Sequence, residues 1–183
     1  RNTHLKLNWY FCFLKLRTNI LFYFMKSIEE IKKIATNAIK IQHNAIGSLL
    51  DRIDTEFSNV VSEILSSKGN LIVTGIGKSA DISRKLVATF NSTGQPALFL
   101  HAADAIHGDL GIIQDNDIVI CISKSGNTDE IKFLVPLIKN MGNKIIALTG
   151  NNKSFLAKNS NFIINVSVEK EACPNNLAPT SST

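Results

Sequence analysis

Five short apolar segments constrain the fold of this chain more than any other feature of its sequence. They span residues 71–74, 97–100, 118–122, 145–149 and 162–166. Between them, apolar residues recur at helical spacing over residues 79–91 and 129–141, and each pattern ends before a glycine. Strands that alternate with helices are joined by right-handed crossovers and pair in parallel. The sequence therefore predicts a three-layer αβα sandwich around a five-stranded parallel sheet, of the flavodoxin or Rossmann type.

The N-terminal part of the chain predicts helices before the first strand. Apolar residues recur at helical spacing from Ile28 to Leu49 and again from Phe57 to Leu65. Residues 1–24 differ from the rest, since they contain the only Trp and both Tyr. We interpret them as a leader translated upstream of a true start at Met25, with a single domain over residues 25–183. A membrane anchor is the alternative, but Lys15 and Arg17 interrupt the apolar run.

Charge and cysteine content exclude several classes of protein. The net charge is +5, of which residues 1–24 carry four positive charges and no acid, so the remainder is close to neutral. A nearly neutral body gives no electrostatic reason to expect a nucleic-acid partner, and no membrane partner is expected. The three cysteines, Cys12, Cys121 and Cys173, lack the spacing of a zinc site or a disulfide framework. They fit a reducing cytoplasm.

The loop Ser123–Thr128 follows the third predicted strand and opens a helix. Its hydroxyl groups and free backbone N–H groups converge where the helix dipole favours an anion. The pattern predicts a phosphate site, and an ordinary N-cap turn is the alternative. Glu130 lies in the first turn of the helix, where the dipole favours a carboxylate. Its position is therefore compatible with a structural role as well as with a catalytic one.

The loop after the first predicted strand, Gly75–Ala80, is a second candidate for ligand binding. Its glycines let the backbone approach a ligand closely. Lys78 adds a positive charge at a helix start, where the dipole disfavours one, and this favours a functional lysine over a merely solvated one. The glycine spacing also matches a loose dinucleotide fingerprint. That site requires an acid after the second strand, where this chain has Leu100 and His101.

Two more segments carry polar residues that need an interpretation. Residues 101–111 hold two His and two Asp, but on a predicted loop no helical face aligns them, so no metal site is expected. Within this loop, we expect Asp109 to orient the imidazole of His107. Residues 169–183 predict an irregular segment. The hydroxyl residues from Thr180 to Thr183 would cap a further helix, so the domain is expected to be cut short there.

Five motifs together resemble the SIS (sugar isomerase) domain of bacterial arabinose-5-phosphate isomerases. They are, in chain order, Gly77-Lys-Ser79, Ser92-Thr-Gly94, His107-Gly-Asp-Leu-Gly111, Ser123-Lys-Ser-Gly126 and Glu171–Thr183. The resemblance covers about residues 28–183. It implies an isomerase that interconverts ribulose 5-phosphate and arabinose 5-phosphate through an enediol, for 3-deoxy-octulosonate in lipopolysaccharide or capsule. It also implies a homo-oligomer with shared active sites and no cofactor.

The resemblance assigns roles to individual residues. Those implied to bind the substrate phosphate are Gly77, Ser79, Ser123, Ser125 and Thr128. Those implied to act in catalysis are Lys78, His107, Glu130 and Glu171. The reaction needs a base, an acid and a stabiliser of the developing oxyanion. Lys78 suits the oxyanion, whereas the choice of base among the two glutamates and the histidine stays open.

The chain departs from the family pattern at several positions. Ala80, Asp81 and Ser83 replace a usual Gly-His-x-Gly, and Asp104 replaces a usual Glu. Lys124 lies inside the loop Ser123–Thr128, here named the serine loop, where it would add a phosphate contact. The family also continues with a helix, a His-Pro-Gly-Gly segment and often CBS domains. These departures keep two alternatives open: a non-catalytic sugar-phosphate-binding SIS domain, and another SIS isomerase that acts on a phosphorylated hexulose.

Overall fold

The computed structural model describes residues 27–183, so the interpretation of residues 1–24 and of Met25 lies outside the described residues. The described residues belong to two units, one that ends at Lys40 and one from Ile41 to Thr183. Helix α2, Ile28–Gly47, confirms the first predicted helix. It begins with a capping box, in which Ser27 N–H donates to Glu30 Oε2 (2.8 Å) and Glu30 N–H donates to Ser27 Oγ (3.2 Å). Within residues 27–183, no helix is long and apolar enough to cross a membrane.

A five-stranded parallel sheet forms the centre of the second unit, as the apolar segments predict. Its strands are β1 Leu71–Gly75, β2 Ala97–His101, β3 Ile118–Ile122, β4 Lys144–Thr149 and β5 Phe162–Asn165. Their order in the sheet is β2-β1-β3-β4-β5, and every pair is parallel. Strands β1 and β3 are buried at every residue. Such strands need apolar, β-branched side chains on both faces, which explains their nearly continuous hydrophobic sequence.

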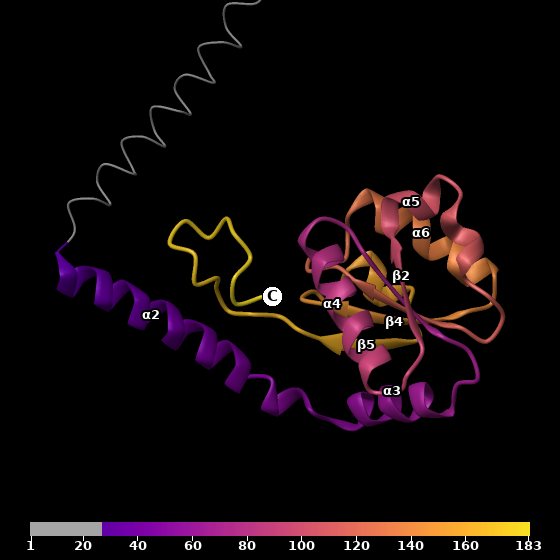
Figure 1. Ribbon diagram of the computed structural model, residues 1–183, viewed down its shortest axis with the longest axis horizontal. Helices are drawn as coiled ribbons and strands as arrows, with labels where there is room; N and C mark the ends of the chain where they lie inside the picture. Colours follow the sequence, from indigo (N-terminus) through magenta and orange to yellow (C-terminus); the bar gives the residue numbers. More distant parts are fainter. Residues whose placement is uncertain (1–26) are drawn as a thin grey trace, which may run out of the picture. The chain divides into compact units, whose positions relative to one another are not determined.

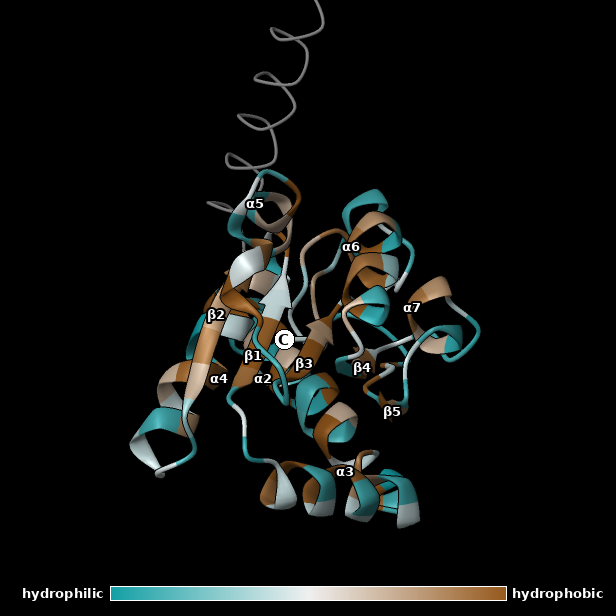
Figure 2. Cartoon of the chain, turned by 90° about the vertical axis from the view of Figure 1, so that its right-hand side faces the viewer, coloured by the Kyte–Doolittle hydropathy of each residue, from teal (hydrophilic) through white to brown (hydrophobic). Residues whose placement is uncertain are grey.

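Helices cover both faces of the sheet and complete the three layers (Figure 1). The helical segments that follow α2 are η1 Leu50–Arg52, α3 Thr55–Ser66, α4 Lys78–Ser92, α5 Ala102–Ile106, η2 Asp109–Ile112, α6 Asp129–Asn140 and α7 Phe155–Lys158. Helices α3 and α4 pack on one face, and α5, α6 and α7 pack on the other. Figure 2 shows the hydrophobic residues concentrated on the strands between these layers. The predicted αβα sandwich is therefore confirmed.

Residues 101–111 differ from the loop that the sequence predicts. Residues 102–106 form α5, and η2 begins at Asp109. The reason is burial, since Ala102 and Ala105 are 0% and 2% exposed and join the core beside Leu134 of α6. Two alanines spaced three residues apart lie on one helical face, and this contact stabilises a helix too short to persist alone.

The strand order creates a crevice at the carboxyl end of the sheet. From β1 the chain crosses to β2, and from β3 it crosses to β4, so the two connections leave in opposite directions. In open parallel sheets, ligands bind at such a switch point. The turn before α4 and the loop Ser123–Thr128 follow β1 and β3, so both lie at this crevice.

The opposite, amino-terminal end of the sheet is closed by a network around the buried carboxylate of Asp117. This carboxylate accepts hydrogen bonds from the backbone N–H of Asn70 (2.7 Å) and of Gln114 (2.9 Å). The side chain of Asn143 donates to the carbonyl oxygens of Gln114 (2.9 Å) and Asp117 (3.0 Å). The network joins the residues that precede β1, β3 and β4.

Replacement of Asp117 by alanine should destabilise the fold by about 2–4 kcal/mol, because it leaves two backbone N–H groups without an acceptor. Chemical denaturation followed by circular dichroism measures the change. The neighbouring Asp115, which is exposed, provides the control: its alanine variant should lie within about 0.5 kcal/mol of the parent. Equal stability of the two variants would contradict the structural role of Asp117.

The free edge of β5 is covered by two charged side chains. Arg52 Nη1 donates to the carbonyl oxygens of Asn165 (3.3 Å) and Ser167 (2.6 Å). Glu56 Oε1 accepts from the backbone N–H of Ile163 (3.1 Å). Backbone groups that would otherwise face solvent along this edge therefore have side-chain partners.

Candidate active site

The loop Ser123–Thr128 folds around its own hydroxyl groups. Ser123, only 4% exposed, accepts a hydrogen bond at Oγ from Gly126 N–H (3.1 Å), and Ser125 Oγ accepts from Asn127 N–H (3.2 Å). Gly126 has φ +65°, a conformation that favours glycine. Thr128 Oγ1 is buried and has no hydrogen-bond partner among the described residues. A buried hydroxyl without a partner costs free energy, which makes Thr128 a candidate for a ligand contact.

Helix α7 fixes this loop from outside. Gly126 O accepts from Leu156 N–H (3.0 Å), and Asn127 Oδ1 accepts from Phe155 N–H (2.8 Å). Both donors lie in the first turn of α7, where backbone N–H groups lack partners within the helix. Loop acceptors therefore pair with the free N–H groups of α7, and these hydrogen bonds hold the loop in place.

A cavity of about 430 Å³, here named the loop cavity, opens beside this loop. Its lining combines residues from the ends of β1, β3, β4 and β5: Ile76, Ser79, Ser123, Lys124, Ser125, Thr128, Gly150, Ser167 and Val168. Four of the five predicted phosphate-binding residues are thus brought together. Gly77, the fifth, is absent from this lining and instead precedes α4 with φ +57°.

A second cavity of about 350 Å³, the tail cavity, lies between α4 and the C-terminal segment. It contains two of the predicted catalytic residues, Lys78 and Glu171, together with Ser182. It shares Ile76, Ser79 and Lys124 with the loop cavity. The two cavities are therefore adjacent, with the loop Ser123–Thr128 on one side and Lys78 and Glu171 on the other.

Glu171 is the most constrained side chain of the tail cavity, with 3% of it exposed. Its Oε2 accepts from the backbone N–H groups of Thr180 (2.8 Å), Ser181 (2.8 Å) and Ser182 (3.3 Å). Its Oε1 accepts from Ser182 Oγ and forms an ion pair with Lys124 Nζ. Burial alone would raise the pKa of Glu171, but hydrogen bonds from Lys124, Ser182 and Thr180 outweigh it and hold the pKa well below its usual range. Glu171 is therefore a carboxylate at neutral pH.

Lys78 is the first residue of α4 and reaches into the tail cavity. Its side chain is 75% exposed, and its ammonium group lies 3.8 Å from Asp81, one turn further along the helix. Such an exposed pair is weak, so Lys78 remains available to an anionic ligand.

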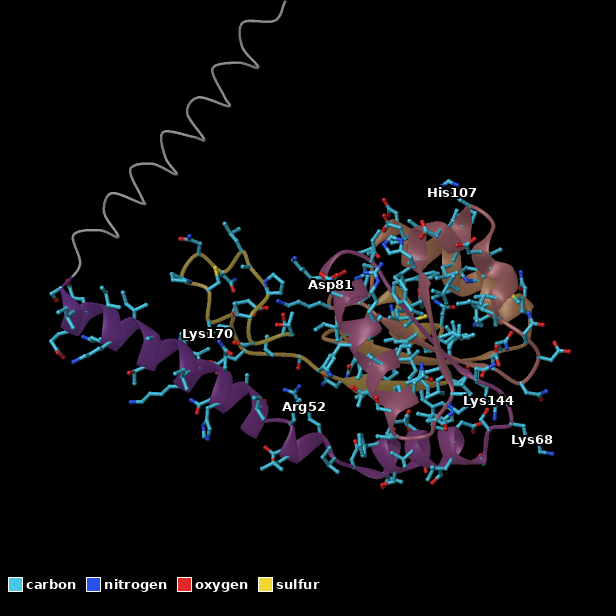
Figure 3. All side chains as sticks on the ribbon, in the orientation of Figure 1. Arg52, Lys68, Asp81, His107, Lys144 and Lys170 are labelled. Atoms are coloured by element: carbon cyan, nitrogen blue, oxygen red, sulfur yellow. The ribbon has the colours of Figure 1, made fainter. Side chains whose placement is uncertain are left out.

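The structure does not bring the other two predicted catalytic residues into these cavities. His107 ends α5, is exposed, and points outward, well away from Asp81 of α4 (Figure 3). No hydrogen bond joins His107 to Asp109 among residues 27–183. Glu130 is half-buried in the first turn of α6 but lines neither cavity.

The sequence did not single out Gly150 and Ser167, which line the loop cavity. Gly150 follows β4 and donates its N–H to Lys124 O (3.0 Å), and Ser167 follows β5 closely. Their place directly after predicted strands would have identified them, because the residues that follow each parallel strand converge on one edge of the sheet.

Comparisons with known proteins agree with this geometry. The SIS domain family model matches residues 64–183. A probable arabinose 5-phosphate isomerase of Haemophilus influenzae is 49% identical over 150 residues, which cover 82% of this chain and 44% of that protein. The arabinose 5-phosphate isomerase KpsF of Escherichia coli is 48% identical over 143 residues, covering 78% of this chain and 44% of KpsF. The chain thus spans less than half the length of these relatives.

A solved structure shares both fold and sequence with this chain. It is an Escherichia coli protein in complex with arabinose 5-phosphate, with a TM-score of 0.82 and 36% sequence identity. The match covers 86% of this chain and 84% of that one.

Proposed function

Because this chain belongs to the SIS domain family, we propose that it carries the active site of an aldose–ketose isomerase that interconverts ribulose 5-phosphate and arabinose 5-phosphate. The observation that carries the proposal is the adjacency of the two cavities. One is lined by hydroxyl groups, including the unpaired Thr128 Oγ1, and the other holds Lys78 and an ionised Glu171. The names of relatives with 48–49% identity support the choice of substrate.

In the proposed complex, the substrate phosphate binds at the serine loop. Ser123, Ser125 and Thr128 offer hydroxyl groups there, and the N-terminus of α6 adds its dipole. The carbon chain then extends past Ser79 into the tail cavity, so that C1 and C2 approach Lys78 and Glu171. The phosphate is not part of the reaction, but the interactions that bind it hold the reacting carbons in place.

The chemistry moves one proton between neighbouring carbons. Starting from ribulose 5-phosphate, a base removes a proton from C1 while the C2 carbonyl oxygen gains a proton, which gives the 1,2-enediol. Return of a proton to C2 and loss of the O1 proton give the aldehyde of arabinose 5-phosphate. Lys78 stabilises the negative charge that develops on oxygen. We assign Glu171 as the base, since it is the one carboxylate that lines the tail cavity within residues 27–183.

The proposal extends to assembly and location. A homo-oligomer follows from the family resemblance, and the separation of His107 from both cavities of one chain supports a site completed by a second copy. A phosphorylated sugar substrate suits the cytoplasm. No cofactor takes part in the proposed steps.

Incubation of the chain with ribulose 5-phosphate in deuterated water, followed by NMR, tests the activity. We expect arabinose 5-phosphate with deuterium at C2. Thr128→Val should raise KM at least about 10-fold, because it removes a hydroxyl from the phosphate site, whereas Thr128→Ser should retain binding. Ligand-induced shifts at residues 123–128 without turnover would favour the non-catalytic sugar-phosphate-binding alternative. Absence of both turnover and binding would contradict the proposal.

A further inference from the structure

Lys124 belongs to both cavities. Its main chain is anchored, because Lys124 O accepts from Gly150 N–H (3.0 Å) and from Thr149 Oγ1 (3.4 Å). Its side chain is 56% exposed and ends in the ion pair with Glu171, 47 residues away in sequence. A fixed backbone with a long, solvent-accessible side chain lets the ammonium group change partner without moving the loop.

The two oxygens of Glu171 play different roles. Oε2 accepts from three consecutive backbone N–H groups of residues 180–182 and from Thr180 Oγ1 (3.1 Å). Oε1 faces the ammonium group of Lys124 and the hydroxyl of Ser182. Loss of Lys124 therefore leaves Glu171 held in place through Oε2, while Oε1 loses its cation.

The loop cavity needs a cation that its other residues do not supply. Among the described residues that line it, Lys124 is the sole charged side chain. The first turn of the adjoining helix instead carries the acids Asp129 and Glu130, which oppose an anion. Asp129 forms an exposed ion pair with Lys132, at 3.2 Å. A phosphate dianion at the serine loop would thus attract Lys124 more than any other group of the cavity.

We propose that Lys124 exchanges partners during substrate binding: it pairs with Glu171 in the free protein and with the substrate phosphate in the complex. Occupation of the serine loop then leaves Oε1 of Glu171 without its cation and ready to accept the substrate proton. Lys124 is thus a positioning residue, because its movement to the phosphate releases Glu171 from the ion pair. This inference rests on the proposed function.

The exchange has a direct electrostatic consequence. Besides Lys124, the groups that face Glu171 are the hydroxyls of Thr180 and Ser182 and the backbone N–H groups of residues 180–182, and Lys78 lines the same cavity. Withdrawal of Lys124 removes a charge that lowers the pKa of Glu171, while burial continues to raise it. The pKa of Glu171 should therefore rise when phosphate binds.

The test follows the side-chain carboxyl carbon of Glu171 by NMR in the whole chain at neutral pH, with inorganic phosphate and then with arabinose 5-phosphate as probes. In the parent, each probe should shift this carboxyl signal as the Lys124 partner leaves. Lys124→Met keeps the length of the side chain and removes the charge. In this variant the signal should already be shifted without a probe, phosphate should no longer move it, and affinity for both probes should fall at least about 10-fold.

Lys170→Met is the matched control, since Lys170 is exposed, adjoins Glu171 in sequence and makes no interaction in the described structure. It should behave as the parent does. An unchanged Glu171 carboxyl signal in the phosphate-bound parent, or parent-like affinity in Lys124→Met, would overturn the exchange while leaving the isomerase intact. Phosphate-driven shifts without arabinose 5-phosphate binding would support the exchange and overturn the proposed substrate. A parent that binds neither probe would overturn both.

Discussion

Replacement of Glu171 by alanine is expected to abolish isomerisation and to release the C-terminal segment. A positioned base contributes about 10²–10⁴-fold to the rate, so kcat should fall by at least about 100-fold. The same change leaves the N–H groups of residues 180–182 without their shared acceptor. Each unpaired group costs about 1–3 kcal/mol if it stays buried, so the segment should open locally instead.

Two measurements separate these effects. Turnover of ribulose 5-phosphate reports catalysis, and hydrogen exchange at residues 180–182 reports the order of the segment. Glu171→Gln retains an oxygen acceptor, so it should keep part of the exchange protection yet lose activity as fully as the alanine variant. Glu169→Ala, at an exposed neighbouring position, should change neither. A fully active glutamine variant would show that Glu171 is not the base.

The low pKa of Glu171 also gives the protein a pH dependence of defined sign. Because the folded protein holds this carboxyl ionised below its ordinary pKa of 4.5, its contribution to stability is present above that pH. The contribution declines as the pH falls below 4.5, where the unfolded chain binds a proton that the folded chain does not. Acid should therefore loosen residues 180–182 in the parent and have less effect in Glu171→Gln.

Replacement of Gly126 by alanine should strongly destabilise the serine loop. Gly126 has φ +65°, and an added Cβ would lie 2.5 Å from the Cβ of Ser154 and closer still to its Oγ. Backbone strain and the clash together should cost about 2–4 kcal/mol. For a chain of this length that lowers Tm by about 4–16 °C, which thermal unfolding followed by circular dichroism will show.

Gly111→Ala is the control for this substitution, since no atom lies within 4 Å of an added Cβ and its φ is not positive. It should leave Tm nearly unchanged. The Gly126 variant should also lose affinity for phosphate, because Ser154 caps α7 and α7 in turn holds the loop. A parent-like Tm would mean that the loop relaxes around the extra methyl group.

The sequence predicted the fold, and it predicted which polar loops meet at one edge of the sheet, because both depend on local patterns. Runs such as Ile118–Ile122 need burial on both faces, which only a parallel sheet with two helical layers supplies. The position of Ser79, Ser123 and Thr128 around one cavity follows from the same sheet, since the strands that precede them end at one edge.

The remainder depends on contacts between distant segments. The pairing of Lys124 with Glu171 joins residues 47 apart and requires a backbone turn at residues 180–182 that has no periodic signature. The expected support of His107 by Asp109 assumed a single loop, whereas His107 caps the C-terminus of α5 and Asp109 begins η2. The packing of Ala102 and Ala105 against α6 decided that outcome, and small residues give little signal of burial.

The side chains along the outer edge of β5 have a consequence for association. An unpaired edge strand is a template onto which another chain can add a strand, and this leads to aggregation. Here Arg52 occupies the carbonyl oxygens of Asn165 and Ser167, and Glu56 occupies the N–H of Ile163. A polypeptide that extended the sheet from this side would first have to displace both charged groups. These two side chains therefore oppose the addition of a further strand along this edge of the sheet.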